Sequence, residues 1–332
     1  MLVLERLRVL HAVAAAGSVV GAARTLHVTT SAVSQQIARL EREVGQPLVE
    51  RHGRGIRLTG AGAVLAAHAE ALLDHAERVS ASLEALRGAV TGRLTVSAFA
   101  TAARGLLPLA LAALRASYPL LTVSMVEQEP HEAVPLLARG LVDVAVVQDW
   151  ASDPLVVPAG LARRHLLVDP FDVALPVSHP LADRSVVSLA SLATMDWIGW
   201  SAGQICHDWL VVTLRSLGAA PRIVHTASEH ATQLALVAAG LGAAVIPRLG
   251  RGPLPAGVRC VPISPAPSRR VFALWRSSAG LRPSVVALVD QLEQAVGEPE
   301  AVAVGLDQPA GGHVGVDLAG VGPALQGVGD DA

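Results

Sequence analysis

Apolar residues near the start of the chain recur with the spacing of short helices. One helix is predicted after the N-capping Ser18, with an apolar face at i, i+3, i+4 and i+7 that comprises Val19, Ala22, Ala23 and Leu26. A second helix is predicted from Thr29 or Thr30 to Gly45, with an inward face that comprises Val33, Ile37, Leu40 and Val44. With a first helix at about 3–15 packed beneath them, these two helices predict a helix-turn-helix unit.

The outward face of the second helix carries small hydroxyl and amide groups. Such groups, on a helix that enters the major groove, can hydrogen-bond base edges and phosphates. After Gly45 and Pro47 end the helix, three arginines follow in a short Gly-broken hairpin, as in a wing that grips phosphates. The predicted DNA-binding residues are Thr30, Ser31, Ser34, Gln35, Arg39, Arg51 and Arg54. The alternative is a helical bundle with a polar face and no nucleic acid.

Residues 1–62 resemble the DNA-binding domain of the LysR-type transcriptional regulators. The matching residues are Gly17-Ser18, Ala22-Ala23, Leu26, Ala32-Val33-Ser34, Ile37, Leu40-Glu41, Gly45, Leu48, Arg51, Arg54, Leu58-Thr59 and Ala61-Gly62. Leu10 and Val49 stand where the family usually has phenylalanine, and both are apolar. The resemblance implies a winged helix-turn-helix domain at 1–60 that binds double-stranded promoter DNA.

A long helix is predicted from Gly60 to Arg87, closed by Gly88. Its apolar positions alternate in steps of four and three: Leu65, Ala69, Leu72, Ala76, Val79, Leu83 and Leu86. This heptad seam predicts pairing with a second copy of the chain through Leu65, Leu72, Val79, Leu83 and Leu86. Packing of the seam on its own domain is the alternative. The resemblance implies dimerisation through this linker helix at 61–90, and a homo-oligomer that is a dimer or a dimer of dimers.

From residue 91 onward the pattern changes to alternating strands and helices, which predicts an α/β domain with a parallel sheet covered by helices. Predicted strands lie at 94–98, 121–125, 142–147, 222–225, 243–246, 258–263 and 270–276, and shorter apolar runs at 163–168, 171–176 and 197–200. Predicted helices lie at 102–117, 131–139, 204–217, 229–239 and 283–296.

This region is similar to the LysR effector-binding domain, in stretches that occur in the family's order. They are Leu107-Pro108, Tyr118-Pro119, Gly140 with Asp143, His179-Pro180-Leu181, and 237–242 with Pro247. The resemblance implies a two-lobed, periplasmic-binding-protein-like α/β effector domain at 91–296. Lobe I would comprise 91–161 and 266–296, and lobe II 162–265, with a hinge at the two crossings. Residues 297–332 have no periodicity and are predicted to form a disordered acidic tail.

A small-molecule effector site is predicted where the two lobes meet, because ligands of such domains bind at carboxyl ends of strands beside helix N-termini. The candidate effector-binding residues are Ser97, Phe99, Thr101, Gln148, Trp200, Ser201, Ser228 and Glu229. Hydroxyl groups at helix starts favour an anion. We therefore expect an effector with one acidic group and an apolar part, held between Thr101 and Ser201. Each residue could instead be an ordinary N-cap.

One motif points to a different class of protein. Gly199-Trp200-Ser201-Ala202-Gly203 matches the G-x-S-x-G nucleophile elbow of serine hydrolases, but no convincing acid and histidine follow it in the required order. A serine hydrolase is therefore one alternative, and a DNA-binding protein without an effector is another. Cys206, His207 and Asp208 are adjacent, so they cannot all face one metal from a helix. We expect no enzyme activity, catalytic residue, metal or cofactor.

The amino-acid composition indicates where a charged partner would bind and which cellular compartment the protein would occupy. Residues 1–60 contain eight arginines and four glutamates, whereas the whole chain has a net charge of −2, so a polyanion would bind at the N-terminal end. The two cysteines make no disulfide framework, which fits a reducing compartment. Charged residues interrupt the first apolar run, and the longest uncharged run resembles a helix, a turn and a strand. We expect a cytoplasmic protein with no membrane contact, and RNA polymerase as a partner if it is an activator.

Overall fold

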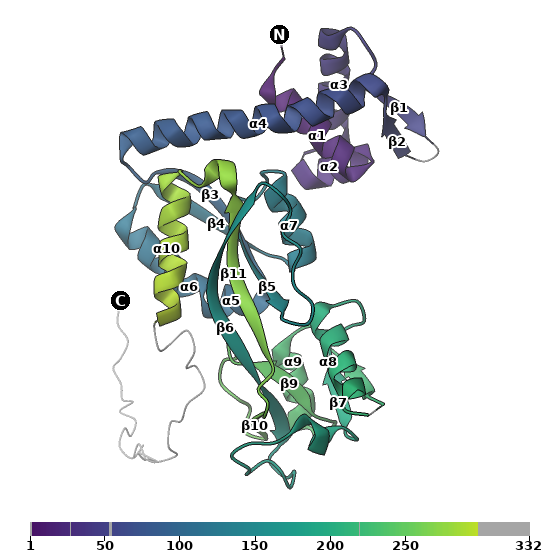
Figure 1. The fold of residues 1–332 in the computed structure, drawn as a ribbon, viewed down its shortest axis with the longest axis vertical. Helices are drawn as coiled ribbons and strands as arrows, with labels where there is room; N and C mark the ends of the chain where they lie inside the picture. Colours follow the sequence, from purple (N-terminus) through teal and green to yellow (C-terminus); the bar gives the residue numbers. More distant parts are fainter. Residues whose placement is uncertain (1, 27, 53–54, 219, 298–332) are drawn as a thin grey trace, which may run out of the picture.

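The computed structural model describes residues 2–297 except 27, 53–54 and 219 (Figure 1). An N-terminal head lies at one end of a long helix, and an elongated α/β domain with two lobes lies below that helix in the view of Figure 1. The predicted wing residue Arg54 and the predicted tail beyond Gly297 lie outside the described residues. No helix within the described ranges has the length and apolarity needed to cross a membrane.

The head comprises α1 (Leu4–Ala16), α2 (Val19–Leu26), α3 (Thr30–Val44) and a hairpin of β1 (Val49–His52) with β2 (Gly55–Leu58). Thr29 is the N-cap of α3, because its Oγ1 accepts a hydrogen bond from the backbone N–H of Ala32 at 3.2 Å. The head core is fully buried at Leu7, Leu10, Val33, Leu40 and Leu48. The winged helix-turn-helix prediction is therefore confirmed, and leucine at position 10 fills the core.

The long helix α4 (Gly60–Arg87) starts inside the head and then leaves it. Thr59 caps its start through a hydrogen bond from Gly62 N at 3.0 Å, and Gly88 ends it with a φ of 63°. Only glycine fits at position 62, since a Cβ there would lie 2.0 Å from the carbonyl oxygen of Leu48. This close approach fixes the first turn of α4 against the head, so the helix and the head move together.

The first lobe has a mixed sheet rather than the wholly parallel sheet predicted. The strands β3 (Gly92–Ala98), β4 (Leu121–Glu127) and β5 (Val144–Trp150) are parallel. The strand β11 (Ser268–Arg276) is antiparallel to β5, because it returns from the second lobe. The covering helices are α5 (Ala100–Gly105), α6 (Leu107–Ser117), α7 (Pro130–Ala138) and α10 (Pro283–Gly297).

The single helix predicted at 102–117 is two helices, α5 and α6, which meet at Leu106. Pro108 lies in the first turn of α6, where the missing N–H of proline is tolerated. In an uninterrupted helix the same residue would remove a backbone hydrogen bond, so the chain starts a new helix instead.

One long strand, β6 (Leu161–Pro176), belongs to both lobes. Its residues 161–170 pair with β11, and its residues 171–176 pair with β9 (Ala244–Pro247) and β10 (Val258–Pro262). The two apolar runs predicted separately are therefore one continuous strand. Together, β6 and β11 form the connection between the lobes that is visible along the centre of Figure 1.

The second lobe carries a separate parallel pair, β7 (Asp196–Gly199) and β8 (Arg222–Thr226). Its helices are α8 (Ile205–Ser216), α9 (His230–Ala238) and the short η1 (Leu189–Leu192). Trp197, Leu210 and Val245 are fully buried in its core. Each lobe thus has a main cluster of buried apolar residues, and strand ends and helix starts meet between the two clusters.

Candidate functional site

The outward face of α3 is available for a partner. Its predicted DNA-binding residues are all exposed: Thr30, Ser31, Ser34, Gln35 and Arg39. The hydroxyl of Ser34 donates to the carbonyl oxygen of Thr30 at 2.9 Å, which holds that side chain along the helix. On the wing, Arg51 is exposed, whereas Arg57 forms an ion pair with Glu50.

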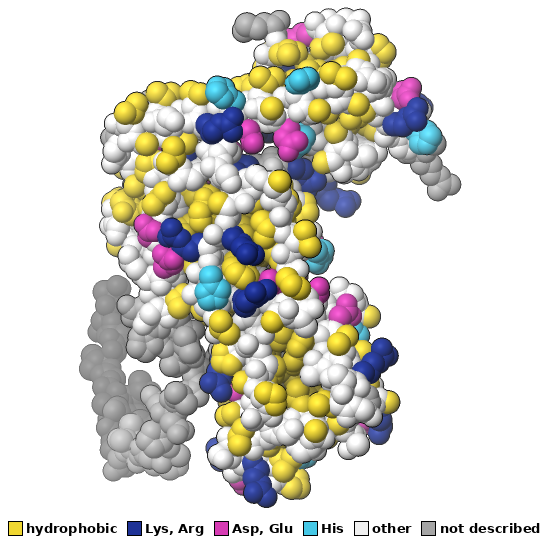
Figure 2. Space-filling view, viewed as in Figure 1, with side chains coloured by type: hydrophobic (Ala, Val, Ile, Leu, Met, Phe, Trp, Pro, Cys, Tyr) yellow, Lys and Arg dark blue, Asp and Glu magenta, His cyan; other side chains and the backbone are white. Residues whose placement is uncertain are grey.

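The apolar seam of α4 divides into two parts. Leu65 packs against the head core, and Ala69 is fully buried there. Farther along the helix, four predicted dimerisation residues have exposed fractions of 43–84%: Leu72, Val79, Leu83 and Leu86. Figure 2 shows apolar side chains along the upper edge of the molecule, over α4. A seam this apolar and this exposed is typical of a helix that pairs with another helix.

A small cavity of about 50 Å³ lies where the two lobes meet. It is lined by Phe99, Ala100, Thr101, Glu129, Gln148, Trp200, Gln204, Ile205, Cys206, Ser228, His230 and Arg269, which we call the crevice. Five of the eight predicted effector-binding residues belong to it: Phe99, Thr101, Gln148, Trp200 and Ser228. The crevice therefore brings together residues from six separate parts of the sequence.

Three predicted effector-binding residues lie outside the crevice lining. Ser97 is buried on β3 and donates to Gln128 Oε1 at 3.1 Å, while Ser201 and Glu229 are exposed. The expectation that Ser201 stands at a helix start is wrong, since α8 begins at Ile205. The intervening residues form a turn in which Gln204 N donates to Ser201 O at 3.2 Å.

Arg269 is the central crevice residue that the sequence analysis missed. Its side chain is 2% exposed, and its guanidinium lies 4.8 Å from the ring centroid of Phe99 and 5.1 Å from that of Phe171. It donates to Asp169 Oδ2 at 2.9 Å and to Thr101 Oγ1 at 2.5 Å, and also to Gln148 Oε1. Such contacts offset the cost of burying a charge. The sequence feature that could have indicated this residue is the pair Arg269 and Arg270, at the start of an apolar strand.

His230 is the second missed residue, and it is buried without a partner for its Nε2 among the described residues. Burial, with the positive charges of Arg269 and Arg104, lowers the pKa of His230 to about 3, so its ring is neutral. Its ring stands edge-on to Trp200, with centroids 5.9 Å apart. A neutral imidazole with an unpaired buried nitrogen can donate a hydrogen bond to a ligand or accept one.

Glu129 and the first turns of the helices α7, α8 and α9 are the remaining features at the crevice. Burial raises the pKa of Glu129, although the charge of Arg269 opposes that effect. The N-cap residues Glu129, Gln204 and Glu229 form no side-chain hydrogen bond to the helices α7, α8 and α9 that follow them. Backbone N–H groups of these first turns are therefore left without a capping side chain, and this arrangement suits an anion.

Among the described residues, neither the hydrolase motif nor the cysteines form part of an assembled catalytic or redox group. Ser201 is exposed, and Nδ1 of the nearby His207 is hydrogen-bonded at 2.8 Å to the carbonyl oxygen of Trp200. Both cysteines are free, and burial raises the pKa of Cys206 to about 12, so it is a thiol at neutral pH. Within the described part of the chain, no three histidine, cysteine, aspartate or glutamate side chains cluster as metal ligands would.

Comparison with known families agrees with this architecture. Residues 4–63 match the family described as bacterial regulatory helix-turn-helix protein, lysR family, and residues 87–297 match the LysR substrate binding domain. The chain therefore belongs to the LysR family of transcriptional regulators. It is a DNA-binding regulator with a domain that responds to a small-molecule effector.

Individual relatives cover most of the chain. A probable HTH-type transcriptional regulator, LrrA, from Synechococcus elongatus is 30% identical over 308 residues, which are 91% of this chain and 99% of the relative. A probable hydrogen peroxide-inducible genes activator from Mycobacterium avium is 29% identical over 82% of this chain and 88% of its own length. The peroxide-bound structure of a cysteine mutant of OxyR from Corynebacterium glutamicum is 28% identical, with a TM-score of 0.58, and the match covers 91% of this chain and 94% of that one.

The ion pair of Arg269 with Asp169 yields a prediction about stability. Arg269→Met keeps an apolar stem of similar length but leaves the carboxylate of Asp169 buried without its cation. We expect the free energy of unfolding, measured by urea denaturation, to fall by about 3–5 kcal/mol. Adding Asp169→Asn should recover a substantial part of that loss. A loss below about 1 kcal/mol for Arg269→Met would show that the pair contributes little.

Proposed function

We propose that the crevice binds a small effector that has one acidic group and an apolar part. The observation that carries this proposal is the neutral Nε2 of His230, which has no hydrogen-bond partner among the described residues and lies beside three helix starts with no capping side chain. A carboxylate there would accept hydrogen bonds from the backbone N–H groups and from the imidazole. Phe99 and Trp200 would cover the apolar part.

In this proposal the second lobe holds the effector through His230 and Gln204, in place of Ser201. Thr101 Oγ1 already accepts a hydrogen bond from the guanidinium of Arg269. In this proposal, the effector would contact the same guanidinium beside Thr101. Because Asp169 pairs with Arg269, the cation is largely neutralised before any effector binds. An effector with a single acidic group fits this charge balance better than one with several.

Peroxide sensing is the second candidate, because the names of two relatives refer to peroxide and Cys206 lines the crevice. A cysteine that reacts with peroxide does so as the thiolate. The pKa of about 12 for Cys206 leaves almost no thiolate at neutral pH. This favours reversible binding of an effector over thiol oxidation. We likewise propose that Ser201 has no catalytic role and that the protein is not an enzyme.

We further propose that two copies pair through the exposed part of the α4 seam and place two α3 helices on one promoter. The dimerising residues would be Leu72, Val79, Leu83 and Leu86, since Leu65 contacts the head. Dimers could pair again into a dimer of dimers. We place the protein in the cytoplasm, where RNA polymerase is its partner if it activates transcription.

The base-reading role of α3 can be separated from phosphate contacts by two substitutions. On a duplex selected from random sequence by the wild-type protein, Gln35→Ala should weaken binding by about 1–3 kcal/mol and change binding to unselected DNA little. Arg51→Ala should weaken both and reduce the slope of log affinity against log salt by about one. Both are measured by fluorescence anisotropy at several salt concentrations. Equal losses on both duplexes for Gln35→Ala would contradict base reading.

The dimer proposal predicts that a charge in the exposed seam separates the two copies. Leu72→Asp should produce a monomer in sedimentation velocity and weaken binding to the selected duplex, because an unpaired carboxylate is costly in an apolar interface. Glu70→Ala changes an exposed residue of the same helix and serves as the control. An unchanged oligomer for Leu72→Asp would mean that the seam does not join copies.

The effector proposal can be tested by thermal-shift screening with small carboxylic acids and their primary amides. At least one acid should raise Tm by about 2 °C or more, while its amide should not. His230→Phe should weaken the binding of that acid about tenfold or more, since it removes the hydrogen-bonding nitrogen.

Ser201→Ala is the matched control for this screen, and it should bind the acid like the wild type because Ser201 does not line the crevice. Binding of the amide as tightly as the acid would contradict the acidic-group assignment. Addition of oxygen to Cys206 by hydrogen peroxide, with a change in DNA binding, would favour peroxide sensing instead.

A further inference from the structure

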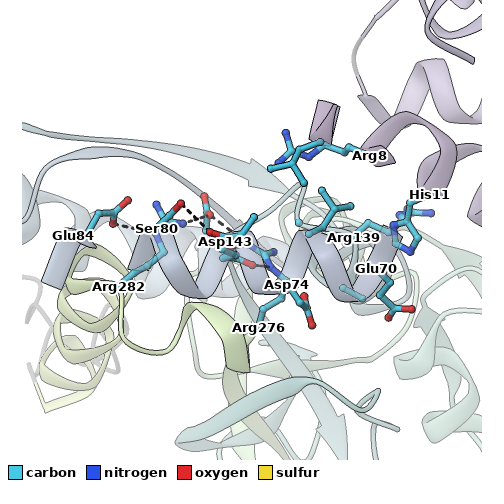
Figure 3. Close-up of a pocket in the computed structure, with 16 residues that line it drawn as sticks. Arg8, His11, Glu70, Asp74, Ser80, Glu84, Arg139, Asp143, Arg276 and Arg282 are labelled. Carbon is cyan, nitrogen blue, oxygen red and sulfur yellow. Dashed lines mark hydrogen bonds and ion pairs between the residues drawn. The ribbon is translucent and has the colours of Figure 1, made fainter. Parts of the chain in front are cut away.

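A second, larger cavity of about 390 Å³ lies between the long helix α4, the helix α1 and the first lobe (Figure 3). Its volume is within the range of about 300–1,000 Å³ that is usual for small-molecule sites. Charged side chains dominate its walls. They are the arginines Arg8, Arg139, Arg276 and Arg282 and the carboxylates of Glu70, Asp74, Glu77, Glu84 and Asp143. The cavity therefore differs in chemistry from the crevice, whose lining includes the aromatic rings of Phe99 and Trp200.

Two of these arginines are already paired with carboxylates. Arg276 donates from Nε to Glu77 Oε2 at 2.6 Å, and its side chain is 7% exposed. Arg282 donates to Glu84 at 3.3 Å and to Asp143 Oδ1 at 2.8 Å. Dashed lines mark contacts of this kind in Figure 3. Because these charges satisfy one another, they build the wall of the cavity and offer little to a ligand.

Arg139, by contrast, has no side-chain partner among the described residues. It is the C-cap residue of α7, it is partly buried, and its Nε is buried without a hydrogen-bond partner in that part of the chain. Burial lowers the pKa of Arg139, and no nearby carboxylate offsets that effect. A guanidinium that is partly desolvated and unpaired is costly, and its planar fork matches a carboxylate. Arg139 is therefore the group in this cavity that an incoming carboxylate would satisfy.

Free carboxylates lie on the wall that α4 forms. Asp74 is partly buried, and Glu70, one turn earlier on the same helix, is exposed. Among the residues drawn in Figure 3, neither carboxylate takes part in a hydrogen bond or an ion pair. Arg139 belongs to the first-lobe wall, so an unpaired cation and an unpaired anion line one space without touching each other.

These opposite charges select a class of ligand. A simple anion would gain Arg139 but would stand beside the carboxylates of α4, and a simple cation would be repelled by Arg139. A small zwitterion has a carboxylate for Arg139 and an ammonium for Asp74, and both hydrogen bonds would be charge-assisted. His11 of α1 lines the cavity near Arg139 and adds a further hydrogen-bonding group.

We propose that this cavity binds a small zwitterion of the amino-acid class, held through its carboxylate by Arg139 and through its ammonium by Asp74. The site is separate from the crevice and does not depend on what the crevice binds. The alternative is a direct ion pair between Arg139 and Asp74, which would leave no free charge for a ligand.

Isothermal titration calorimetry of the full-length protein tests this site. The probes are the standard L-amino acids, together with β-alanine and γ-aminobutyrate, which separate the two charges by a longer chain. At least one probe should bind with a Kd below about 1 mM. Its N-acetyl derivative and its primary amide should each bind about tenfold more weakly or worse, because each lacks one of the two charges.

Two substitutions on opposite walls test the assigned contacts. Arg139→Gln and Asp74→Asn should each weaken binding of that probe about tenfold or more, since each removes one charged partner. Arg78→Gln is the matched control, because Arg78 lies on α4, is exposed and does not line the cavity. His230→Phe changes the crevice alone, so the probe should bind this variant as it binds the wild type.

The proposal is overturned if no probe binds, or if the best probe binds Arg139→Gln as tightly as it binds the wild type. It is also overturned if His230→Phe abolishes binding, since the probe would then occupy the crevice. Thermal unfolding without ligand tests the alternative. If the double variant of Arg139→Gln and Asp74→Asn is no less stable than either single variant, the two side chains pair directly and the proposal is wrong.

Discussion

The ion pair between Arg269 and Asp169 organises the effector domain. The two residues are direct partners in the pairing of β11 with β6, the two strands that pass between the lobes. Asp169 Oδ1 also accepts a hydrogen bond at 2.9 Å from the backbone N–H of Leu249, which follows the second-lobe strand β9. A charge this deeply buried is stable only when its partners hold it. One buried pair thus joins both crossing strands to the second lobe.

That pair also determines the chemistry of the crevice. Because Arg269 is already matched by Asp169 and by the acceptors Thr101 and Gln148, it offers little free charge. Its field nevertheless acts with burial to keep His230 neutral, and it opposes the rise in the pKa of Glu129. In the proposed effector site, the remaining recognition would come from a neutral imidazole, helix starts and aromatic faces. Such a site would distinguish ligands by hydrogen-bond geometry more than by total charge.

Local patterns were enough to predict the head and the linker helix. The cap at Thr29, the helix-ending glycines at 45 and 88, and the apolar spacing are all properties of neighbouring residues. Backbone hydrogen bonding and side-chain periodicity act over the same short range, so the sequence displays them directly. The division of the helix predicted at 102–117 follows from Pro108, a local signal that the spacing of apolar residues did not reveal.

The crevice was only partly predictable, for a physical reason. Phe99, Thr101 and Gln148 follow from the rule that sites form at strand ends, and they do line it. Arg269 and His230 depend on contacts between residues far apart in sequence, which no local pattern encodes. The sequence by itself determined the family, the recognition helix and the apolar seam of α4. Only the tertiary structure decided which polar side chains are buried together, because burial and ion pairing depend on which strands become neighbours.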